Sequence, residues 1–239
     1  MIKSDMLTVN GQPMEVQVGI PEGKGPFPAL LLMYHRGGFD KFTHNRLEAL
    51  AAEGFLTVTP DIYFRAPKDA EDRKTYLKDS DAVAAIKAAY AYAEQHPQTA
   101  KDQIGIIGHC MGGRLTLQGA SVLPNLKVAA VFYGGGVFVS WGNEGPAPAE
   151  SLGNIRCPVI GFFGGQDQNP SPEDVNKIDQ ILTKHGVQHV FHRYPDVGHG
   201  FQQIALGRGG DAERHASDDA WAKMKAFVTQ KMASTAAVA

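Results

Sequence analysis

The 239 residues suit one domain of the larger α/β kind, and we expect residues 1–239 to fold as a single unit. Hydrophobic residues form 43% and charged residues 20% of the chain, and the net charge of -2 excludes the strongly basic surface of a nucleic-acid or anionic-membrane binder. The polar start MIKSDMLTVNGQ lacks a signal-peptide core, and no apolar run is long enough to span a bilayer. Only Cys110 and Cys157 are present, so we expect two free thiols in a reducing cytoplasm.

Strand-like and helix-like stretches alternate along the chain after a β-rich start. Two short runs around Asn10-Gly11 predict a hairpin. Apolar runs predict strands over 28–35, 55–63, 104–109, 128–136, 157–167 and 187–195. Helical patterns occupy 42–54, 70–95, 112–121, 172–186 and 218–232, with Gly54 as a stop signal. The alternation predicts a mostly parallel sheet with helices on both faces and active residues beyond the carboxyl ends of its strands.

The segment GIIGHCMGGRL, residues 105–115, reads as a buried strand, a glycine-rich turn and the start of a helix. Its glycines allow a tight turn that lifts the Cys110 side chain to the carboxyl edge of the sheet. A helix N-terminus favours a thiolate there, and the Met111 amide would point toward a developing oxyanion. Hydrolases of one large fold carry serine in the related pattern G-x-S-x-G. The alternative is a small cysteine packed in a core.

A thiol nucleophile needs a base, and the base needs an acid that orients it. Asp167 follows the strand VIGFFGG, and His199 lies in PDVGHGF after the strand HVFHRY. Both fit the chain order of nucleophile, acid and histidine. Asp196 is a rival acid on the loop of His199, but Asp167 arrives from another strand and can hold the ring from behind. Each residue alone is equally consistent with a loop side chain that caps a backbone amide.

The elements GHCMGG, GGQD and GHGF, together with TPDIYFR, resemble the dienelactone hydrolase family of the α/β-hydrolase superfamily. The resemblance covers most of the chain, and G-x-C-x-G-G is its most specific part. It implies the α/β-hydrolase fold and hydrolysis of an ester or lactone through an acyl-thioester. It also implies Cys110 as nucleophile, His199 as base and Asp167 as its orienting acid, with oxyanion amides from Met111 and Arg36.

Two positions depart from the family members that open dienelactones. His35 stands where those enzymes carry a glutamate that partners the resting thiol, and Gln203 stands where they carry a carboxylate-binding arginine. The acyl-transfer residues are therefore intact, whereas the recognition of an acidic lactone is not. His35 could bond to substrate, tune Cys110 or pack at the strand end, and Arg36 and Arg73 could bind an anion.

The irregular stretch 134–154, rich in Gly and Pro, carries Phe138 and Trp141. We expect these two rings either to bind substrate as a wall of its site or to cover the core. The C-terminal tail 234–239 is expected to be frayed.

Nothing in the sequence favours a metal or a cofactor. His185, His189 and His192 are close in sequence but straddle a helix end and a strand, so their rings should not converge on a metal. The glycine-rich segments match neither a P-loop nor a dinucleotide fingerprint.

The leading hypothesis is a cytoplasmic ester or lactone hydrolase of the carboxymethylenebutenolidase type. Its partner would be a small-molecule substrate, with no nucleic acid or membrane, and the chain would be a monomer or a small homo-oligomer. The first alternative is a thiol-based redox or ligand-binding protein on a hydrolase scaffold, favoured by His35, Gln203 and the setting of Cys110. The second is an inert scaffold or interaction protein.

Overall fold

The computed structural model describes residues 1–143 and 145–233, whose eight strands form one sheet in the order β1-β2-β4-β3-β5-β6-β7-β8. Three strands form its antiparallel side, where β2 pairs with both neighbours: β1 (Ile2–Val9), β2 (Gln12–Gly19) and β4 (Leu56–Pro60). The remaining strands run parallel to β4: β3 (Phe27–Met33), β5 (Thr99–His109), β6 (Ala129–Phe132), β7 (Val159–Gly164) and β8 (His189–Tyr194). The predicted mostly parallel sheet is confirmed.

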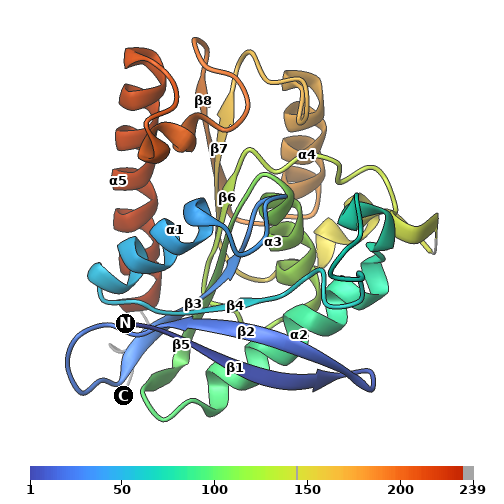
Figure 1. Cartoon of the computed structure of the whole chain (residues 1–239). Coiled ribbons are helices and arrows are strands. Elements are labelled where there is room, and N and C mark those ends of the chain that lie inside the picture. Colours follow the sequence, from blue (N-terminus) through green and yellow to red (C-terminus); the bar gives the residue numbers. More distant parts are fainter. Residues whose placement is uncertain (144, 234–239) are drawn as a thin grey trace.

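Helices cover both faces of the sheet, as the alternation predicts (Figure 1). One face carries α1 (Lys41–Ala52) and α5 (Asp211–Ala233). The other carries α2 (Asp79–Gln95), α3 (Met111–Val122) and α4 (Pro172–Lys184). Successive residues of a strand point to opposite faces. Leu30 and Leu32 of β3 accordingly pack under α1 and α5, whereas Leu31 packs under α2 and α3.

Local sequence explains where several elements turn or stop. Asn10 (φ +49°) and Gly11 (φ +75°) form the tight turn between β1 and β2, so the predicted hairpin is confirmed. The carboxylate of Asp40 caps α1 by accepting a hydrogen bond from the Thr43 amide. Gly54, at φ +88°, follows the last residues of α1 and is the stop that the sequence predicts.

Several element boundaries differ from the sequence prediction, among them the start of β5, which is Thr99 rather than 104. The helix expected over 70–95 begins only at Asp79, because the charged segment before it is mainly exposed and has no apolar face to bury. The strand expected over 128–136 stops at Phe132, where Tyr133 turns the chain with φ +39°. The last helix begins at Asp211 rather than 218. Among the described residues, 3-10 segments at 73–76, 141–143, 148–154 and 201–206 connect these elements.

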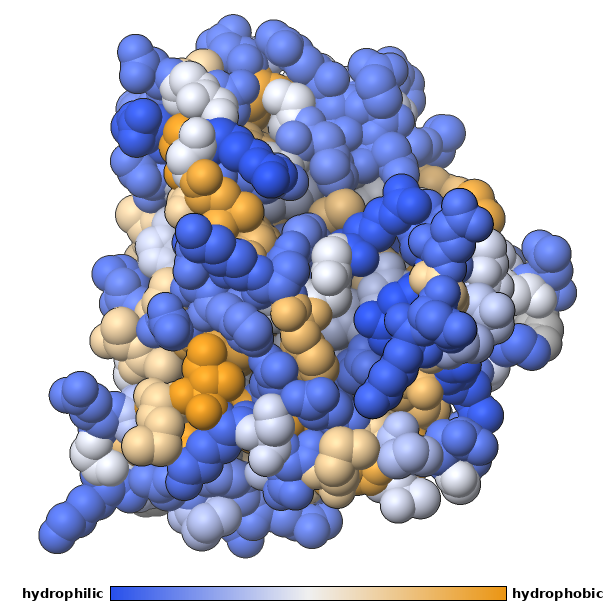
Figure 2. Space-filling view, viewed as in Figure 1, coloured by the Kyte–Doolittle hydropathy of each residue, from blue (hydrophilic) through white to orange (hydrophobic). Residues whose placement is uncertain are grey.

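The surface in Figure 2 is mainly hydrophilic, with apolar residues in separate patches. Within residues 1–143 and 145–233, none of the helices combines the length and the apolarity that crossing a membrane would require. The tail 234–239, expected to be frayed, lies outside the described residues.

Candidate active site

Cys110 occupies the sharp turn between β5 and α3. Its backbone has φ +57° and ψ -119°, a region that residues with a side chain rarely adopt. The Cys110 amide donates to the Phe132 carbonyl at 3.0 Å, and the Gly113 amide donates to the Cys110 carbonyl at 2.9 Å. A Cβ atom at Gly112 would collide with the Met33 carbonyl, so only glycine lets α3 start this close to β3. The turn fixes the thiol at the carboxyl edge of the sheet.

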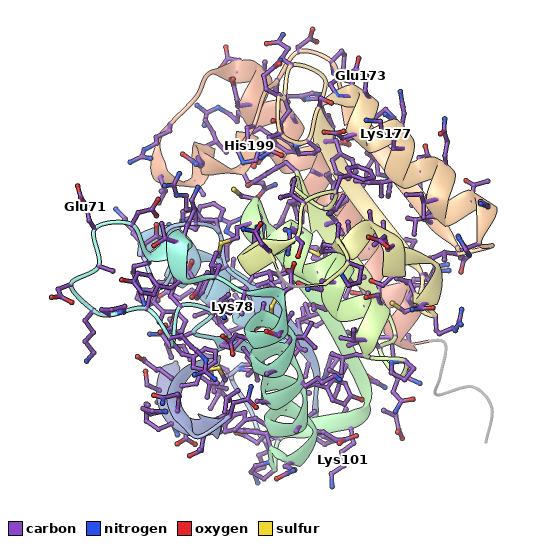
Figure 3. The ribbon with its side chains drawn as sticks, turned by 90° about the vertical axis from the view of Figure 1, so that its right-hand side faces the viewer. Glu71, Lys78, Lys101, Glu173, Lys177 and His199 are labelled. Atoms are coloured by element: carbon purple, nitrogen blue, oxygen red, sulfur yellow. The ribbon has the colours of Figure 1, made fainter. Side chains whose placement is uncertain are left out.

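His199 and Asp167 come from the loops after β8 and β7. Nδ1 of His199 lies 2.8 Å from Oδ2 of Asp167, whose other oxygen accepts the Asn169 amide at 2.8 Å. Asp167 is only 2% exposed, so it holds the imidazole from the interior, while Figure 3 shows His199 on the loop above the sheet. The Tyr133 ring contacts the imidazole of His199 edge-on, and the two ring centroids are 5.1 Å apart. Asp167, rather than the rival Asp196, is the acid that bonds to His199.

The thiol and the imidazole shift each other's pKa. Burial by itself would raise the pKa of Cys110, but the hydrogen bond and charge of His199 and the amides of Met111 and Arg36 outweigh it and lower the pKa. Burial would lower the pKa of His199, but the bonds and charges of Asp167 and Cys110 raise that pKa to about 10. Each shift favours the charged form of its group, which is a thiolate for Cys110 and an imidazolium for His199.

Two backbone amides and one tyrosine complete the surroundings of the sulfur. The backbone amides of Met111 and Arg36, which follow the ends of β5 and β3, both act on the Cys110 sulfur and lower its pKa. The hydroxyl of Tyr63 lies 3.0 Å from the Arg36 carbonyl oxygen and 3.4 Å from the Met111 sulfur, which links the two donor residues. The sequence analysis did not single out Tyr63. The signal was present, since Tyr63 belongs to the segment TPDIYFR that carries the family resemblance.

A cavity of about 550 Å³ opens over the thiol. Its lining combines basic, apolar and backbone groups: Arg36, Lys74, Leu77, Cys110, Met111, Arg114, Gly135, Gly136, Trp141, Asn169 and His199. Trp141, one of the two rings singled out in the sequence, lines this cavity. Phe138 is absent from this lining among the described residues, and its ring lies 5.5 Å from the Lys177 ammonium of α4 instead.

A buried ion pair fixes the loop that carries Trp141. Arg114, 1% exposed, donates to both carboxylate oxygens of Asp79, at 2.6 and 3.1 Å. The same guanidinium donates to the carbonyls of Gly136 and Val139 and lies 3.7 Å from the centre of the Trp141 ring. The Trp141 amide in turn donates to Asp79 at 2.8 Å. Sequence reasoning missed this network because nothing in the pattern pairs position 79 with position 114.

The side chains of the remaining candidates each have a partner of their own. His35 bonds through Nε2 to Asp40 at 2.8 Å and lies on another side of the thiol from the large cavity. A guanidinium nitrogen of Arg36 lies 3.5 Å from a carboxylate oxygen of Asp72. The guanidinium carbon of Arg73 lies over the Tyr63 ring, 4.7 Å from its centre.

The histidines that cluster in sequence do not meet. His189 bonds to Asp179 at 2.8 Å, and His192 stacks on Phe162 at 5.4 Å. In the part of the chain that the structure describes, no three His, Cys, Asp or Glu residues are arranged to bind a metal ion. Cys110 and Cys157 are both free thiols, as expected.

Known proteins match this chain along most of its length. The model of the dienelactone hydrolase family matches residues 14–232. A Synechocystis protein, provisionally named a carboxymethylenebutenolidase, is 30% identical over 94% of this chain and 95% of its own length. A Salmonella typhimurium protein with the same provisional name is 30% identical over 86% of this chain and 78% of its own.

Solved structures confirm the α/β-hydrolase fold that the resemblance implied. The crystal structure of a Klebsiella pneumoniae protein, provisionally titled a dienelactone hydrolase, superposes with a TM-score of 0.84 at 24% identity. The match covers 96% of this chain and 99% of that one.

Proposed function

The chain belongs to the dienelactone hydrolase family, and from that premise we propose that it hydrolyses esters or lactones through a thioester on Cys110. The observation that carries the proposal is the convergence of the Cys110 thiol, the His199 imidazole and the Asp167 carboxylate from three separate strand ends. Their order along the chain is the order of nucleophile, acid and histidine in α/β hydrolases. The provisional carboxymethylenebutenolidase names of two relatives support a lactone as substrate.

In the first half of the reaction, the Cys110 thiolate attacks the carbonyl carbon of the bound substrate. The carbonyl oxygen becomes an oxyanion, and the convergence of the Met111 and Arg36 amides at the sulfur supports a role for them as its donors. The His199 imidazolium then gives its proton to the leaving oxygen as the C–O bond breaks and the thioester remains. In a lactone, the released hydroxyl stays attached to the acyl chain.

In the second half, water attacks the thioester and neutral His199 accepts one of its protons. The C–S bond breaks, its electron pair returns to the sulfur of Cys110, and the acid product leaves. Asp167 stays ionised throughout, because its role is to hold the Nδ1–H of His199 and to stabilise the imidazolium. Each turnover consumes one water and restores the thiolate–imidazolium pair.

The chemistry of the thiol sets the class of substrate. A thiolate is a good nucleophile and also a good leaving group, so it suits activated acyl groups better than amides. The cavity of about 550 Å³ is within the usual range for small-molecule sites. Esters and lactones with good leaving groups are therefore the substrates to try first.

The test is turnover of a panel of aryl esters and lactones by wild type, C110A and C157A. We expect C110A to lose kcat/KM on the order of 10⁴-fold or more. C157A is the matched control, since Cys157 is a buried thiol outside the cavity lining, and should stay within about twofold of wild type. Equal turnover by wild type and C110A would overturn the proposal and favour the thiol-redox or ligand-binding alternative.

A further inference from the structure

A second, much smaller cavity adjoins the sulfur. It measures about 30 Å³, which is close to the volume of one water molecule in the liquid. Its lining consists of His35, Phe42, Cys110, Tyr133, His199, Gly200 and Gln203. Cys110 and His199 also line the large cavity, so the nucleophile and its base stand between the two spaces. An acyl group in the large cavity would leave the small one available to a second reactant.

His35 offers this small cavity a hydrogen-bond acceptor. Its Nε2 lies 2.8 Å from Oδ2 of Asp40, and its ring packs edge-on against Phe42 at 4.9 Å. Burial would raise the pKa of Asp40, but the bonds from His35 and Thr43 outweigh burial and lower it, so Asp40 is an anion. An anionic acceptor assigns the proton of neutral His35 to Nε2 and leaves Nδ1 as an acceptor. Within residues 1–143 and 145–233, that Nδ1 has no hydrogen-bond partner.

Gln203 offers a donor. Its Oε1 accepts a bond from the Arg208 guanidinium at 3.3 Å, and its backbone amide donates to the Gly200 carbonyl at 2.8 Å. Because Arg208 already donates to Oε1 of Gln203, the group of this side chain that can donate to a ligand is Nε2. Gly200 has φ +74°, and a Cβ atom there would lie only 3.1 Å from Nε2 of Gln203. Glycine at position 200 therefore lets the Gln203 amide lie close to the backbone.

We infer that the small cavity holds the water that hydrolyses the thioester, with His35 and Gln203 as its positioning residues. The inference rests on the proposed function. The water donates one proton to His199 and a hydrogen bond to Nδ1 of His35, and it accepts a hydrogen bond from Nε2 of Gln203. Its oxygen forms the new bond to the acyl carbon, the C–S pair returns to Cys110, and the second proton leaves with the carboxylic acid.

This assignment explains the two departures from the family pattern together. The family resemblance matches His35 and Gln203 to a glutamate and an arginine of dienelactone-opening enzymes, and both residues line the same small cavity. A water held there reaches the thioester without passing the acyl group in the large cavity. The step that gains from such positioning is deacylation alone, because acylation needs no water.

The experiment measures deacylation directly. Wild type, H35F and Q203L are acylated with an activated aryl ester, freed of excess ester by rapid desalting, and followed by intact mass as the acyl group leaves. We expect each variant to lose the acyl group at least tenfold more slowly, while the rate of acylation stays within about twofold of wild type. H215F and Q180L change exposed residues away from both cavities and should match wild type in both steps.

A second readout separates water positioning from a general structural effect. Added hydroxylamine competes with water for the thioester, and the ratio of hydrolysis to hydroxylaminolysis should fall about tenfold in H35F and Q203L. Q203L keeps the test valid if H35F fails to fold, since Gln203 is only half-buried. Deacylation at the wild-type rate in Q203L, or an equal slowing of acylation and deacylation, would overturn the inference. Failure of wild type to form any acyl adduct on Cys110 would instead overturn the proposed function, and this inference with it.

Discussion

Cys110 and Cys157 are the same residue type beside the same sheet, yet their surroundings shift the pKa values of the two thiols in opposite directions. Burial removes water from both, and burial raises the pKa of a thiol. At Cys157, which is 4% exposed, burial prevails and the pKa rises to about 12. At Cys110, the hydrogen bond and charge of His199 and two backbone amides outweigh burial, and the pKa falls.

The difference follows from the end of the strand that each cysteine occupies. Cys157 stands two residues before β7, at its amino end, where it packs into the core. Cys110 follows directly after β5, at its carboxyl end, where the Met111 amide at the start of α3 lowers the pKa of its thiol. The direction of the pKa shift at each cysteine therefore follows its position in the parallel sheet, which burial alone does not predict.

D167N should weaken the Cys110 site strongly, because it removes the carboxylate that bonds to His199. The loss of the carboxylate removes the orientation of His199 and one cause of its raised pKa, so kcat/KM should fall about 10²- to 10⁴-fold. The alkaline limit of activity, set by loss of the imidazolium at a pKa of about 10, should move to lower pH. The pH profile of kcat/KM measures both effects.

The matched control is D196N, which changes the rival carboxyl on the loop of His199. It should keep the wild-type profile within about twofold. A loss in D196N as large as that in D167N would contradict the role given to Asp167.

A smaller effect separates the two cysteines by stability rather than by activity. The φ of +57° at Cys110 stores strain of about 1–3 kcal/mol, and glycine would relieve it at an entropic cost of roughly 0.5–1 kcal/mol. C110G should therefore have a free energy of unfolding about 1 kcal/mol above that of C110A, which also lacks the thiol but keeps the strained backbone. C157A, which empties part of the core, should lower the free energy of unfolding of the wild type by about 1 kcal/mol. Denaturant unfolding measures both effects, and a stability of C110G at or below that of C110A would show that position 110 is not strained.

The sequence predicted the sheet, its helices and the order of the site residues because those features leave local patterns. The glycines around Cys110 and the strand before each loop are visible in one dimension, so the turn between β5 and α3 was predictable. The assignment of Asp167 rather than Asp196 was also predictable, because parallel strands bring their carboxyl ends together. Chain order and sheet topology carry that information.

What the sequence did not predict depends on contacts between distant side chains. The Arg114–Asp79 pair that fixes Trp141 joins the start of α2 to α3, and no spacing rule connects those positions. Phe138 has the same apolar character as Trp141, yet its ring lies against Lys177 rather than in the large cavity. The start of α2 at Asp79 likewise depends on burial against β4 and β5, which the helical pattern alone does not show.

The most direct test of the central claim is the pH dependence of iodoacetamide alkylation at the two cysteines of the folded protein. The pKa of Cys110 is lowered below that of an ordinary thiol, so its alkylation rate should level off at a lower pH than the rate of an ordinary thiol does. Cys157, with its pKa raised to about 12, should stay unlabelled until the protein is unfolded. A rate at Cys110 that levels off only at or above the pKa of an ordinary thiol, about 8.5, would contradict the account.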